Sequence, residues 1–510
     1  MKEKREILQK IVNLCKRRGF VFPSCEIYGG FSGFYDYGPL GAEMKKNLKD
    51  DWWERFVRQR SDVVGIDACT INPHKLWKAS GHVEGFTDPL IECKSCSFRV
   101  RADHLIEEKL NMNVDGLPLE RINEIIRKHN LTCPKCGGEF TQVRKFNLMF
   151  KTFVGAIEDE AHLAYLRPET AQLIFTNFKL VAETMRLKLP FGIAQIGRVF
   201  RNEISPRDFL FRMREFEQME IEYFIHPEKI NDCPYLSKEI LNFEINIYSI
   251  EMQKNREGHR KMRLGEAIEK GMIKSGWHAY WLYEVVKWFL DLGIKKENLR
   301  LRQHLPEERS HYALDTWDIE YLFPFGWKEI HGIANRGDYD LRQHMKFSGE
   351  DLRYYDEEKK EKILPWVIEP SQGVDRAFLA FLIDAYHEED DRVVLKLHPK
   401  LAPIKVGVFP LVSKDNLPEK AKEVFNMLRK RFVAFYDEKG SIGRRYARQD
   451  EIGTPFCITI DYQTLEDDTV TIRERDSKEQ VRARIEKLEN ILEGLINGNL
   501  SFNELKEKEL

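Results

Sequence analysis

Polar and apolar side chains alternate strictly along residues 216–225. One face is polar or aromatic and holds Phe216, Gln218, Glu220, Glu222 and Phe224. The opposite face is apolar and holds Met219, Ile221, Tyr223 and Ile225. A period of two is that of a β-strand. The segment therefore predicts a strand with an apolar back and with carboxylates beside an aromatic ring on its front.

The segment 199–204 alternates in the same way, with Arg201 and Glu203 on one face. An arginine-rich loop joins it to the first strand and contains Arg207, Arg212 and Arg214. Guanidinium groups suit phosphate, an aromatic face suits a purine base, and carboxylates suit magnesium or an ammonium group. The two segments therefore predict an antiparallel hairpin that carries a nucleotide site.

Helical and extended patterns also divide the remainder of the chain. Apolar stripes at helical spacing predict helices over residues 39–60 and 173–185, and a strand at 366–371 runs through Gly373 into another helix. Residues 227–300 are charged, and we expect them to form a helical insertion. From about residue 405, strands alternate with helices, which indicates a compact α/β domain with a partly parallel sheet.

Composition narrows the class of protein. The chain has 510 residues, 42% of them hydrophobic and 32% charged, which predicts several globular domains. A formal net charge of -2 argues against a protein that coats nucleic acid through bulk charge. The N-terminal residues form an amphipathic pattern rather than a signal peptide, and we find no apolar run of membrane-spanning length. We therefore expect a cytoplasmic protein without a membrane segment.

Four of the nine cysteines form two Cys-x-x-Cys pairs, Cys93 with Cys96 and Cys133 with Cys136. Two such pairs are typical of tetrahedral zinc coordination by thiolates, and four sulfur ligands leave no open position for catalysis. The pairs therefore predict a structural Zn²⁺ site in a small lobe over residues 88–145, which interrupts the main domain.

At this point the chain resembles the homodimeric type of glycyl-tRNA synthetase, a class II aminoacyl-tRNA synthetase family. The resemblance covers nearly the whole chain and rests on four segments: Phe-Tyr-Asp-Tyr-Gly-Pro-Leu-Gly (34–41), Trp-Lys-Ala-Ser-Gly-His (77–82), Arg-Pro-Glu-Thr-Ala-Gln (167–172) and Glu-Pro-Ser (369–371). The Arg201-to-Phe224 hairpin and the strand–helix turn from Glu369 to Arg376 follow the class II order.

This resemblance implies an α+β fold with several parts. An antiparallel β-sheet flanked by helices would form the catalytic domain from residues 1–87 and 146–400. A zinc-ribbon-like insertion would occupy 88–145, and a helical insertion 227–300. An α/β anticodon-binding domain would follow at 401–510, and the helix that carries Trp52 and Trp53 would lie at the dimer interface.

The resemblance also implies an ATP site, formed by Arg201, Glu203, Arg212, Phe216, Glu329 and Arg376. Arg201 and Arg376 are the expected catalytic residues. Arg201 is expected to hold the α-phosphate, and Phe216 to stack on adenine opposite Arg376, which also reaches the γ-phosphate. Arg212 is expected to contact phosphate, and Glu203 and Glu329 to contact adenine or Mg²⁺.

For the amino acid, the resemblance implies that Glu169, Glu220 and Glu369 surround the glycine ammonium group. Arg336 is expected on the carboxylate side and Ser371 near the α-carbon. The expected activity is ATP-dependent attachment of glycine to tRNA(Gly) through a glycyl-adenylate. The expected partners are ATP with Mg²⁺, glycine, tRNA(Gly) and a second copy of the chain, with the zinc lobe and the 227–300 insertion as candidates for contact with the acceptor stem.

Three alternatives stay open on the sequence. A non-catalytic class II paralogue that acts as a binding or regulatory subunit is expected to lack a phosphate-binding arginine or an ammonium-binding carboxylate, whereas Arg201, Glu220 and Arg376 are present. A synthetase for threonine, proline or histidine would need a side-chain pocket. A zinc-containing nucleic-acid-binding protein without enzymatic activity would explain the cysteines and leave the hairpin unexplained.

Overall fold

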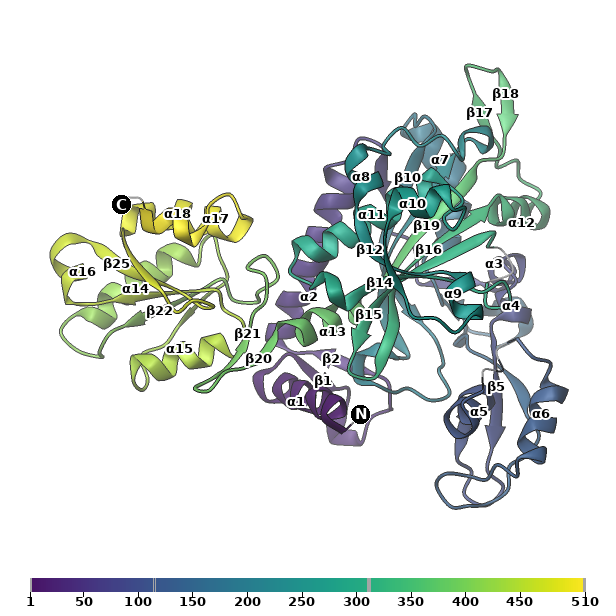
Figure 1. Ribbon diagram of the computed structural model, residues 1–510, viewed down its shortest axis with the longest axis horizontal. Coiled ribbons are helices and arrows are strands. Elements are labelled where there is room, and N and C mark those ends of the chain that lie inside the picture. The colour runs from purple at the N-terminus through teal and green to yellow at the C-terminus, as the bar shows by residue number, and fades with distance from the viewer. Residues whose placement is uncertain (1, 113, 115, 310–312, 508–510) are drawn as a thin grey trace.

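A nine-stranded, mostly antiparallel sheet is the centre of the computed structural model, which describes residues 2–112, 114, 116–309 and 313–507 (Figure 1). Its spatial order is β13-β12-β14-β15-β16-β19-β11-β10-β3. The bounds are β3 Val63–Gly65, β10 Phe191–Phe200, β11 Glu215–Ile225, β12 Glu244–Tyr248, β13 Arg260–Arg263, β14 Leu299–Gln303, β15 Asp315–Phe323, β16 Gly326–Gly337 and β19 Trp366–Gly373. The β10–β3 and β12–β14 pairs are parallel.

The predicted hairpin is formed by β10 and β11, which pair in antiparallel register with Val199 opposite Phe216 and Gln195 opposite Glu220. The expected alternation on β11 is confirmed, since Met219 and Ile221 lie in the large apolar core behind the sheet. Strand β10 ends at Phe200, so Arg201 and Glu203 lie in the loop rather than in the strand.

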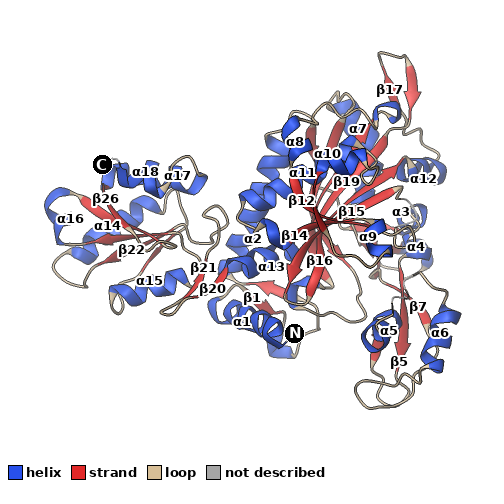
Figure 2. Ribbon diagram, viewed as in Figure 1, coloured by secondary structure: helices blue, strands red, loops and turns tan. Residues whose placement is uncertain are grey.

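Helices cover both faces of the sheet (Figure 2). The back is packed by α2 Pro39–Trp53, α11 Gly276–Asp291 and α13 Val374–Ala385, and a π-helical turn, Glu54–Arg58, extends α2. The front is packed by α7 Ala171–Thr184 and α12 Tyr339–Ser348, where Phe178 of α7 lies 4.3 Å from Phe224 of β11 between ring centroids. The sheet is therefore a central layer with apolar contacts on both sides.

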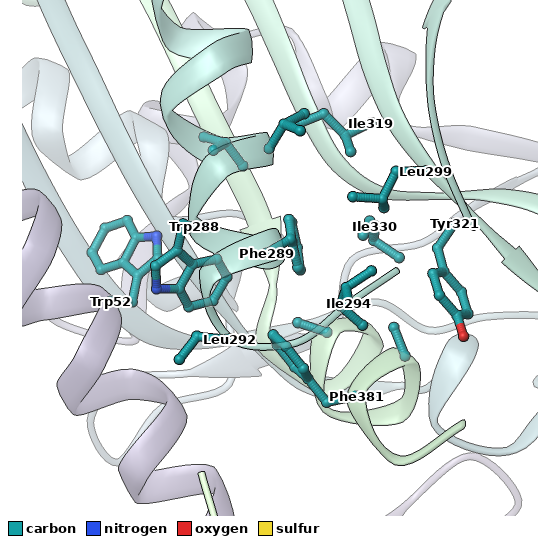
Figure 3. Packing of buried hydrophobic residues seen from close by; sticks show 14 of the residues in the cluster. Trp52, Trp288, Phe289, Leu292, Ile294, Leu299, Ile319, Tyr321, Ile330 and Phe381 are labelled. Carbon is teal, nitrogen blue, oxygen red and sulfur yellow. The ribbon is translucent and has the colours of Figure 1, made fainter. Parts of the chain in front are cut away.

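The large core behind the sheet contains Trp52, which is 2% exposed, together with Trp288 and Phe289 of α11 (Figure 3). The rings of Trp52 and Trp288 both pack on Phe56. The position of the helix that carries Trp52 and Trp53 at a dimer interface stays a prediction, and Trp52 itself contributes to the core of its own chain. The Trp52 ring packs against residues of its own chain, and the centroid of the Phe56 ring lies 5.5 Å from its own. An apolar helical stripe cannot by itself distinguish a core contact from a subunit contact.

The segment 227–300 differs from the expected helical insertion. It contributes β12 and β13, and β14 begins at its end, so that it extends the main sheet. Its helices are α8 Lys238–Asn242, α9 Ile250–Lys254, α10 Leu264–Glu269 and α11. Helix α11 buries Trp277, Trp281 and Trp288 almost completely. The charges of this segment lie on short elements and turns, which concealed the strands and the buried helix.

The cysteine-containing lobe has its own small core and projects from one end of the catalytic part (Figure 1). Its elements are β5 Thr87–Glu92, β6 Arg99–Arg101, α5 Ala102–Leu110, α6 Leu119–Lys128 and β7 Arg144–Asn147. Strand β5 lies between β6 and β7 in an antiparallel sheet. Because β5 and β7 are the entry and the exit of the lobe, both of its connections pass through one strand pair.

Helix α1 and several short elements complete the catalytic part. They are α1 Lys2–Arg18, β1 Val21–Pro23, β2 Tyr35–Tyr37, β4 Ile71–Pro73, α3 His74–Ala79, α4 His82–Gly85, β8 Lys151–Phe153, β9 Leu163–Leu166, β17 Tyr354–Asp356, β18 Glu361–Ile363, β20 Tyr386–Glu388 and β21 Val393–Leu395. Helices α3 and α4 follow β4, and β9 leads directly toward α7. These two connections bring His82 and Glu169 to the front of the sheet.

The C-terminal part is a separate α/β unit with its own core and a five-stranded sheet in the order β23-β22-β24-β25-β26. The bounds are β22 Val406–Pro410, α14 Leu417–Leu428, β23 Ala434–Tyr436, α15 Ile442–Asp450, β24 Phe456–Ile460, α16 Tyr462–Asp467, β25 Thr469–Glu474, β26 Gln480–Arg484, α17 Leu488–Asn497 and α18 Phe502–Glu507. Strand β22 is parallel to both β23 and β24, whereas β25 and β26 are antiparallel, so the expected partly parallel sheet is confirmed.

A buried charge network ties this unit to the segment that precedes it. Asp450 is 1% exposed and accepts hydrogen bonds from Arg473 at 2.9 and 3.0 Å and from Arg392 at 2.5 Å. Arg392 lies between β20 and β21, outside the C-terminal sheet. The network therefore holds two parts of the chain together.

Among helices of the described ranges, none has the length and apolarity needed to cross a membrane.

Replacement of this buried carboxylate should destabilise the C-terminal unit. Asp450→Asn removes the carboxylate that pairs with the buried Arg473 and leaves Arg392 with Glu389 as its remaining counter-charge. We expect the free energy of unfolding to fall by about 3–5 kcal/mol. Hydrogen exchange of the β24 and β25 amides measures this. The matched control is Asp437→Asn, which breaks a pair with the half-exposed Arg448 and should cost about 1 kcal/mol or less. Equal losses in the two variants would contradict the prediction.

Candidate functional site

Carboxyl groups converge on the front face of the central strands. Glu220 of β11 lies directly opposite Ser371 of β19 in the strand register. Glu369 lies two residues earlier on β19 and therefore on the same face. One carboxylate oxygen from each of Glu220, Glu222 and Glu369 lies within 4.8 Å of the other two. The sequence placed Glu222 on this face but did not assign it to the site, although its period-two spacing from Glu220 was a usable signal.

Arg336, at the end of β16, is the central cation of this acidic pocket. Its Nη1 donates a hydrogen bond of 2.8 Å to Glu369, and its Nε and Nη2 donate to the two carboxylate oxygens of Asp340, each at 2.8 Å. The side chain is 1% exposed. Arg336 thus holds Glu369 in place, and Asp340 of α12 fixes Arg336.

Glu169 lies at the edge of the same pocket and is held from two sides. Its Oε1 accepts a 2.9 Å hydrogen bond from Gln172, and its Oε2 lies 3.3 Å from Nε2 of His82. Gln172 also donates to Asp340 at 2.9 Å, which links Glu169 to the arginine network. Nδ1 of His82 lies 2.8 Å from the Ser80 hydroxyl. The segments 77–82 and 167–172 therefore meet at one buried contact.

The carboxyl groups of the pocket do not share one electrostatic environment. Burial alone would raise the pKa of Glu169, but His82 and Arg336 outweigh it and lower that pKa below its ordinary value. Burial raises the pKa of Glu220, with the charge of Glu169 adding to the shift. Burial also raises the pKa of Glu369 well above its ordinary value, although Arg336 opposes the shift. The pocket is therefore rich in acidic groups that favour an incoming cation.

An arginine-lined cleft lies beside the pocket, at the other end of β11. The Arg201 guanidinium lies over the Phe216 ring, 5.3 Å from its centroid, and over Phe86, at 5.4 Å. Nε of Arg201 donates to the Pro168 carbonyl at 3.0 Å. Phe216 and Glu220 stand on the same face of one strand, four residues apart, so the aromatic ring and the acidic pocket are joined by a single rigid element.

Arg376, in the first turn of α13, closes the cleft from the opposite side. Its guanidinium stacks on Phe211 at 4.4 Å from the ring centroid, and its Nη1 donates to the Glu329 carboxylate at 2.9 Å. Desolvation opposes ionisation of Glu329, but Arg376 outweighs it and lowers the pKa of this carboxyl. Arg376 therefore lies over Phe211 and not over Phe216, and the face of Phe216 is taken by Arg201.

Glu203 and Arg212 lie on the side of the cleft that borders the cysteine lobe. Their charged groups approach to 3.7 Å. Asp88, at the base of the lobe, pairs with Arg101 at 2.9 Å. Burial raises the pKa of Asp88 to about 6; Arg101 counters this rise, while Glu203 adds to it. The structure thus brings the six residues of the expected ATP site close together, since Arg212 lies near both Glu203 and Arg376, and Glu329 lies near both Arg376 and Arg201, which contacts Phe216.

A second carboxylate, which the sequence did not predict, lies beside Glu329. Asp318 of β15 and Glu329 both reach the front of Gly332, where a β-carbon would lie 3.8 Å from Asp318 and 3.7 Å from Glu329. His304 lies 2.7 Å from the Asp318 carboxylate, and burial raises the pKa of Asp318 to about 6. Two oxygen ligands so placed fit the preference of Mg²⁺ for carboxylates. No local motif marks Asp318, because the pair forms only when β15 and β16 align.

The four predicted cysteine ligands also converge. The Cys93 and Cys136 sulfurs lie 3.5 Å apart, the Cys96 and Cys133 sulfurs 3.7 Å apart, and all four lie within 4.8 Å of one another. Tetrahedral zinc with bonds of about 2.3 Å needs sulfur atoms about 3.8 Å apart. Gly138 permits this approach, since a β-carbon there would lie 3.2 Å from the Cys93 sulfur. The four thiolates therefore fit a structural metal.

Comparisons with known proteins identify both large parts of the chain. Residues 150–386 match the family model for the tRNA synthetase class II core domain (G, H, P, S and T), and residues 405–495 match the anticodon binding domain. A glycine–tRNA ligase of Caldanaerobacter subterraneus subsp. tengcongensis is 50% identical over 496 residues, which cover 95% of this chain and 98% of that protein. A glycine–tRNA ligase of Clostridium tetani is 50% identical over 94% of this chain and 96% of its own length.

Metal content tests the cysteine site. We expect the purified protein to contain about one zinc per chain, and Cys133→Ser to lose it and to expose the amides of β5 and α5 to hydrogen exchange. Elemental analysis and exchange mass spectrometry measure the two effects. Cys25→Ser is the matched control, because Cys25 is exposed and outside the cluster. Full zinc retention by Cys133→Ser would refute the assignment.

Proposed function

The chain belongs to the glycine–tRNA ligase family of class II synthetases, and we propose that it attaches glycine to tRNA(Gly) through a glycyl-adenylate. The observation that carries this proposal is the strand β11, which presents Phe216 beside the arginine-lined cleft and Glu220 in the acidic pocket. An adenylate joins a base, a phosphate and an ammonium group in one molecule. The cleft and the pocket offer matching groups in that order along one strand.

The first chemical step needs no general base. A carboxylate oxygen of glycine attacks the α-phosphorus of ATP, the new oxygen–phosphorus bond forms, and the bond to pyrophosphate breaks. Arg201 is proposed to stabilise the charge that develops on the α-phosphate, and Arg376 to hold the leaving polyphosphate, with Arg212 as a further phosphate contact. Phe216 is proposed to stack on adenine once Arg201 turns toward phosphate, and Glu203 to contact adenine or the metal.

Mg²⁺ would add positive charge next to the polyphosphate, and Glu329 and Asp318 are the carboxylates proposed to hold it. Both groups face the cleft at Gly332, and Glu329 already accepts from Arg376. Arg376 would then exchange its contact with Glu329 for phosphate, which is the stronger anion.

Glycine recognition is proposed to rest on charge at one end and on lack of space at the other. Glu220 and Glu369 would accept the ammonium group, and Glu169 would add its charge from the edge of the pocket. Ser371, opposite Glu220, would lie near the α-carbon. Arg336 would act by holding Glu369 toward the ammonium group, since Glu369 and Asp340 receive its hydrogen bonds. A larger amino acid adds volume that a solid wall can exclude.

In the second step a terminal ribose hydroxyl of tRNA attacks the carbonyl carbon of the adenylate, and AMP leaves. The anticodon-binding domain at residues 405–495 supports tRNA as the partner. We further propose that the enzyme acts as a homodimer in the cytoplasm, with a structural Zn²⁺ on Cys93, Cys96, Cys133 and Cys136.

Amino-acid-dependent ATP–pyrophosphate exchange, measured with all twenty amino acids and without tRNA, tests the proposal. We expect exchange with glycine alone. Arg201→Ala should lower kcat by about 10²- to 10³-fold, because a charge that stabilises the transition state is removed.

The matched control is Arg198→Ala, three residues earlier on the same chain segment. Its side chain is 67% exposed and pairs with Glu215 outside the cleft, so exchange should stay near the wild-type rate. Exchange with another amino acid would reject the glycine pocket. Absence of exchange with a well-folded, zinc-loaded protein would instead favour a non-catalytic class II paralogue.

A further inference from the structure

Lys45 of α2 is largely buried behind the sheet and has no role in the proposed reaction. Its side chain is 12% exposed. Its Nζ lies 2.8 Å from a carboxylate oxygen of Glu217 on β11 and donates a hydrogen bond of 2.9 Å to Asp375 on α13. It also lies 4.1 Å from the centroid of the Tyr37 ring. A single ammonium group therefore joins α2, β11 and α13.

Asp375 is the group through which Lys45 reaches the nucleotide cleft. Strand β19 ends at Gly373, which lies opposite Gln218 of β11. Beyond this end, the Asp375 carboxylate accepts a hydrogen bond of 2.8 Å from the backbone N–H of Glu217. A side-chain oxygen thus satisfies a backbone donor at the point where the strand pairing stops. The first turn of α13 is thereby fixed to the backbone of β11.

This contact lies directly beside two residues proposed to bind ATP. Glu217 follows Phe216 in β11, and Asp375 precedes Arg376 in the first turn of α13. Successive side chains of a strand point to opposite faces, so Glu217 holds the strand from behind while Phe216 stands on its front. The hydrogen bond between Asp375 and the Glu217 backbone therefore restrains the aromatic ring and the guanidinium group relative to each other.

The contact depends on a counter-charge, because two carboxylates meet behind the cleft. Asp375 is 2% exposed, and within the described ranges Lys45 is the cation that forms an ion pair with it. Glu217, by contrast, is also paired with Lys49 at 2.9 Å. Burial alone would lower the pKa of Lys45, but Asp375 and Glu217 outweigh it and raise that pKa. Loss of the Lys45 charge would leave Asp375 as a buried acid without a cation, which is unfavourable.

We propose that Lys45 is a positioning residue for the nucleotide cleft. Its charge holds Asp375 on the Glu217 backbone. This bond in turn sets Phe216 and Arg376 in the relative positions that bind ATP. The inference rests on the proposed function and adds to it a residue that acts from the back of the sheet without touching the substrate.

Lys45→Met tests the assignment, because methionine keeps an unbranched side chain and removes the charge. In ATP–pyrophosphate exchange we expect the KM for ATP to rise about 10-fold, since a small displacement of binding groups is enough for such a loss. The KM for glycine should change less than twofold, because Glu220 lies where β11 pairs directly with β19. A defect in folding alone would lower the apparent kcat and leave both KM values unchanged.

Two further variants serve as a control and as a rescue. Lys46→Met is the matched control: Lys46 is exposed and pairs with Asp50 on the same helix, so the KM for ATP should stay at the wild-type value. In the rescue, Asp375→Asn is added to Lys45→Met. The amide removes the acid that has lost its cation and keeps an oxygen for the Glu217 N–H. The double variant should therefore return the KM for ATP to within about threefold of the wild-type value.

Tyr37→Phe provides an independent test with almost no change in side-chain volume. It removes the hydroxyl that donates to Asp375, and the KM for ATP should rise about threefold while the KM for glycine stays. An unchanged KM for ATP in Lys45→Met, or in Tyr37→Phe should Lys45→Met not fold, would overturn the assignment. An equal rise of the KM for both substrates would also overturn it. A wild-type protein without glycine-dependent exchange would instead reject the proposed function itself.

Discussion

The excess of carboxyl groups on the buried front face of β11 and β19 is the constraint on which the site depends. Glu169, Glu220, Glu222, Glu369 and Asp340 crowd around the guanidinium of Arg336. Acids directly beside one another in a sheet repel, and burial strengthens that repulsion. The arrangement holds only because the sheet, α7 and α12 fix every backbone position around it. A small cation in this position would relieve the repulsion, which supports the proposed binding of the glycine ammonium group here.

Local periodicity in the sequence accounts for the strand that carries this site. The alternation over residues 216–225 predicted both the direction of Glu220 and the apolar contacts of Met219 behind it, and the cysteine spacing predicted convergence of four sulfurs. These features depend on one strand or one motif. The meeting of Glu169, Glu220 and Glu369 depends on three elements far apart in the chain, and only the family resemblance suggested it.

Features that arise from pairing between distant strands could not be predicted from the sequence. Asp318 meets Glu329 only because β15 and β16 align, and Glu222 joins the pocket because β19 lies beside β11. The segment 227–300 was misjudged for a related reason: its strands are four or five residues long, and their burial is set by the sheet edge they join. The pair of Arg473 and Asp450 in the C-terminal unit likewise forms only when β25 and α15 meet in the fold.

The position of the cysteine lobe adds a physical link between its fold and the nucleotide cleft. The lobe is joined to the catalytic part through β5 and β7, and Asp88 of β5 feels the charges of both Glu203 and Arg212. Arg212 is itself partly buried, and its charge is opposed by Arg101 of the lobe and by Arg376 of the cleft. Cations held close together in this way bind a polyanion more strongly than separate ones, because its negative charge relieves their mutual repulsion. The lobe therefore contributes to the cleft through electrostatics, although its cysteines lie outside it.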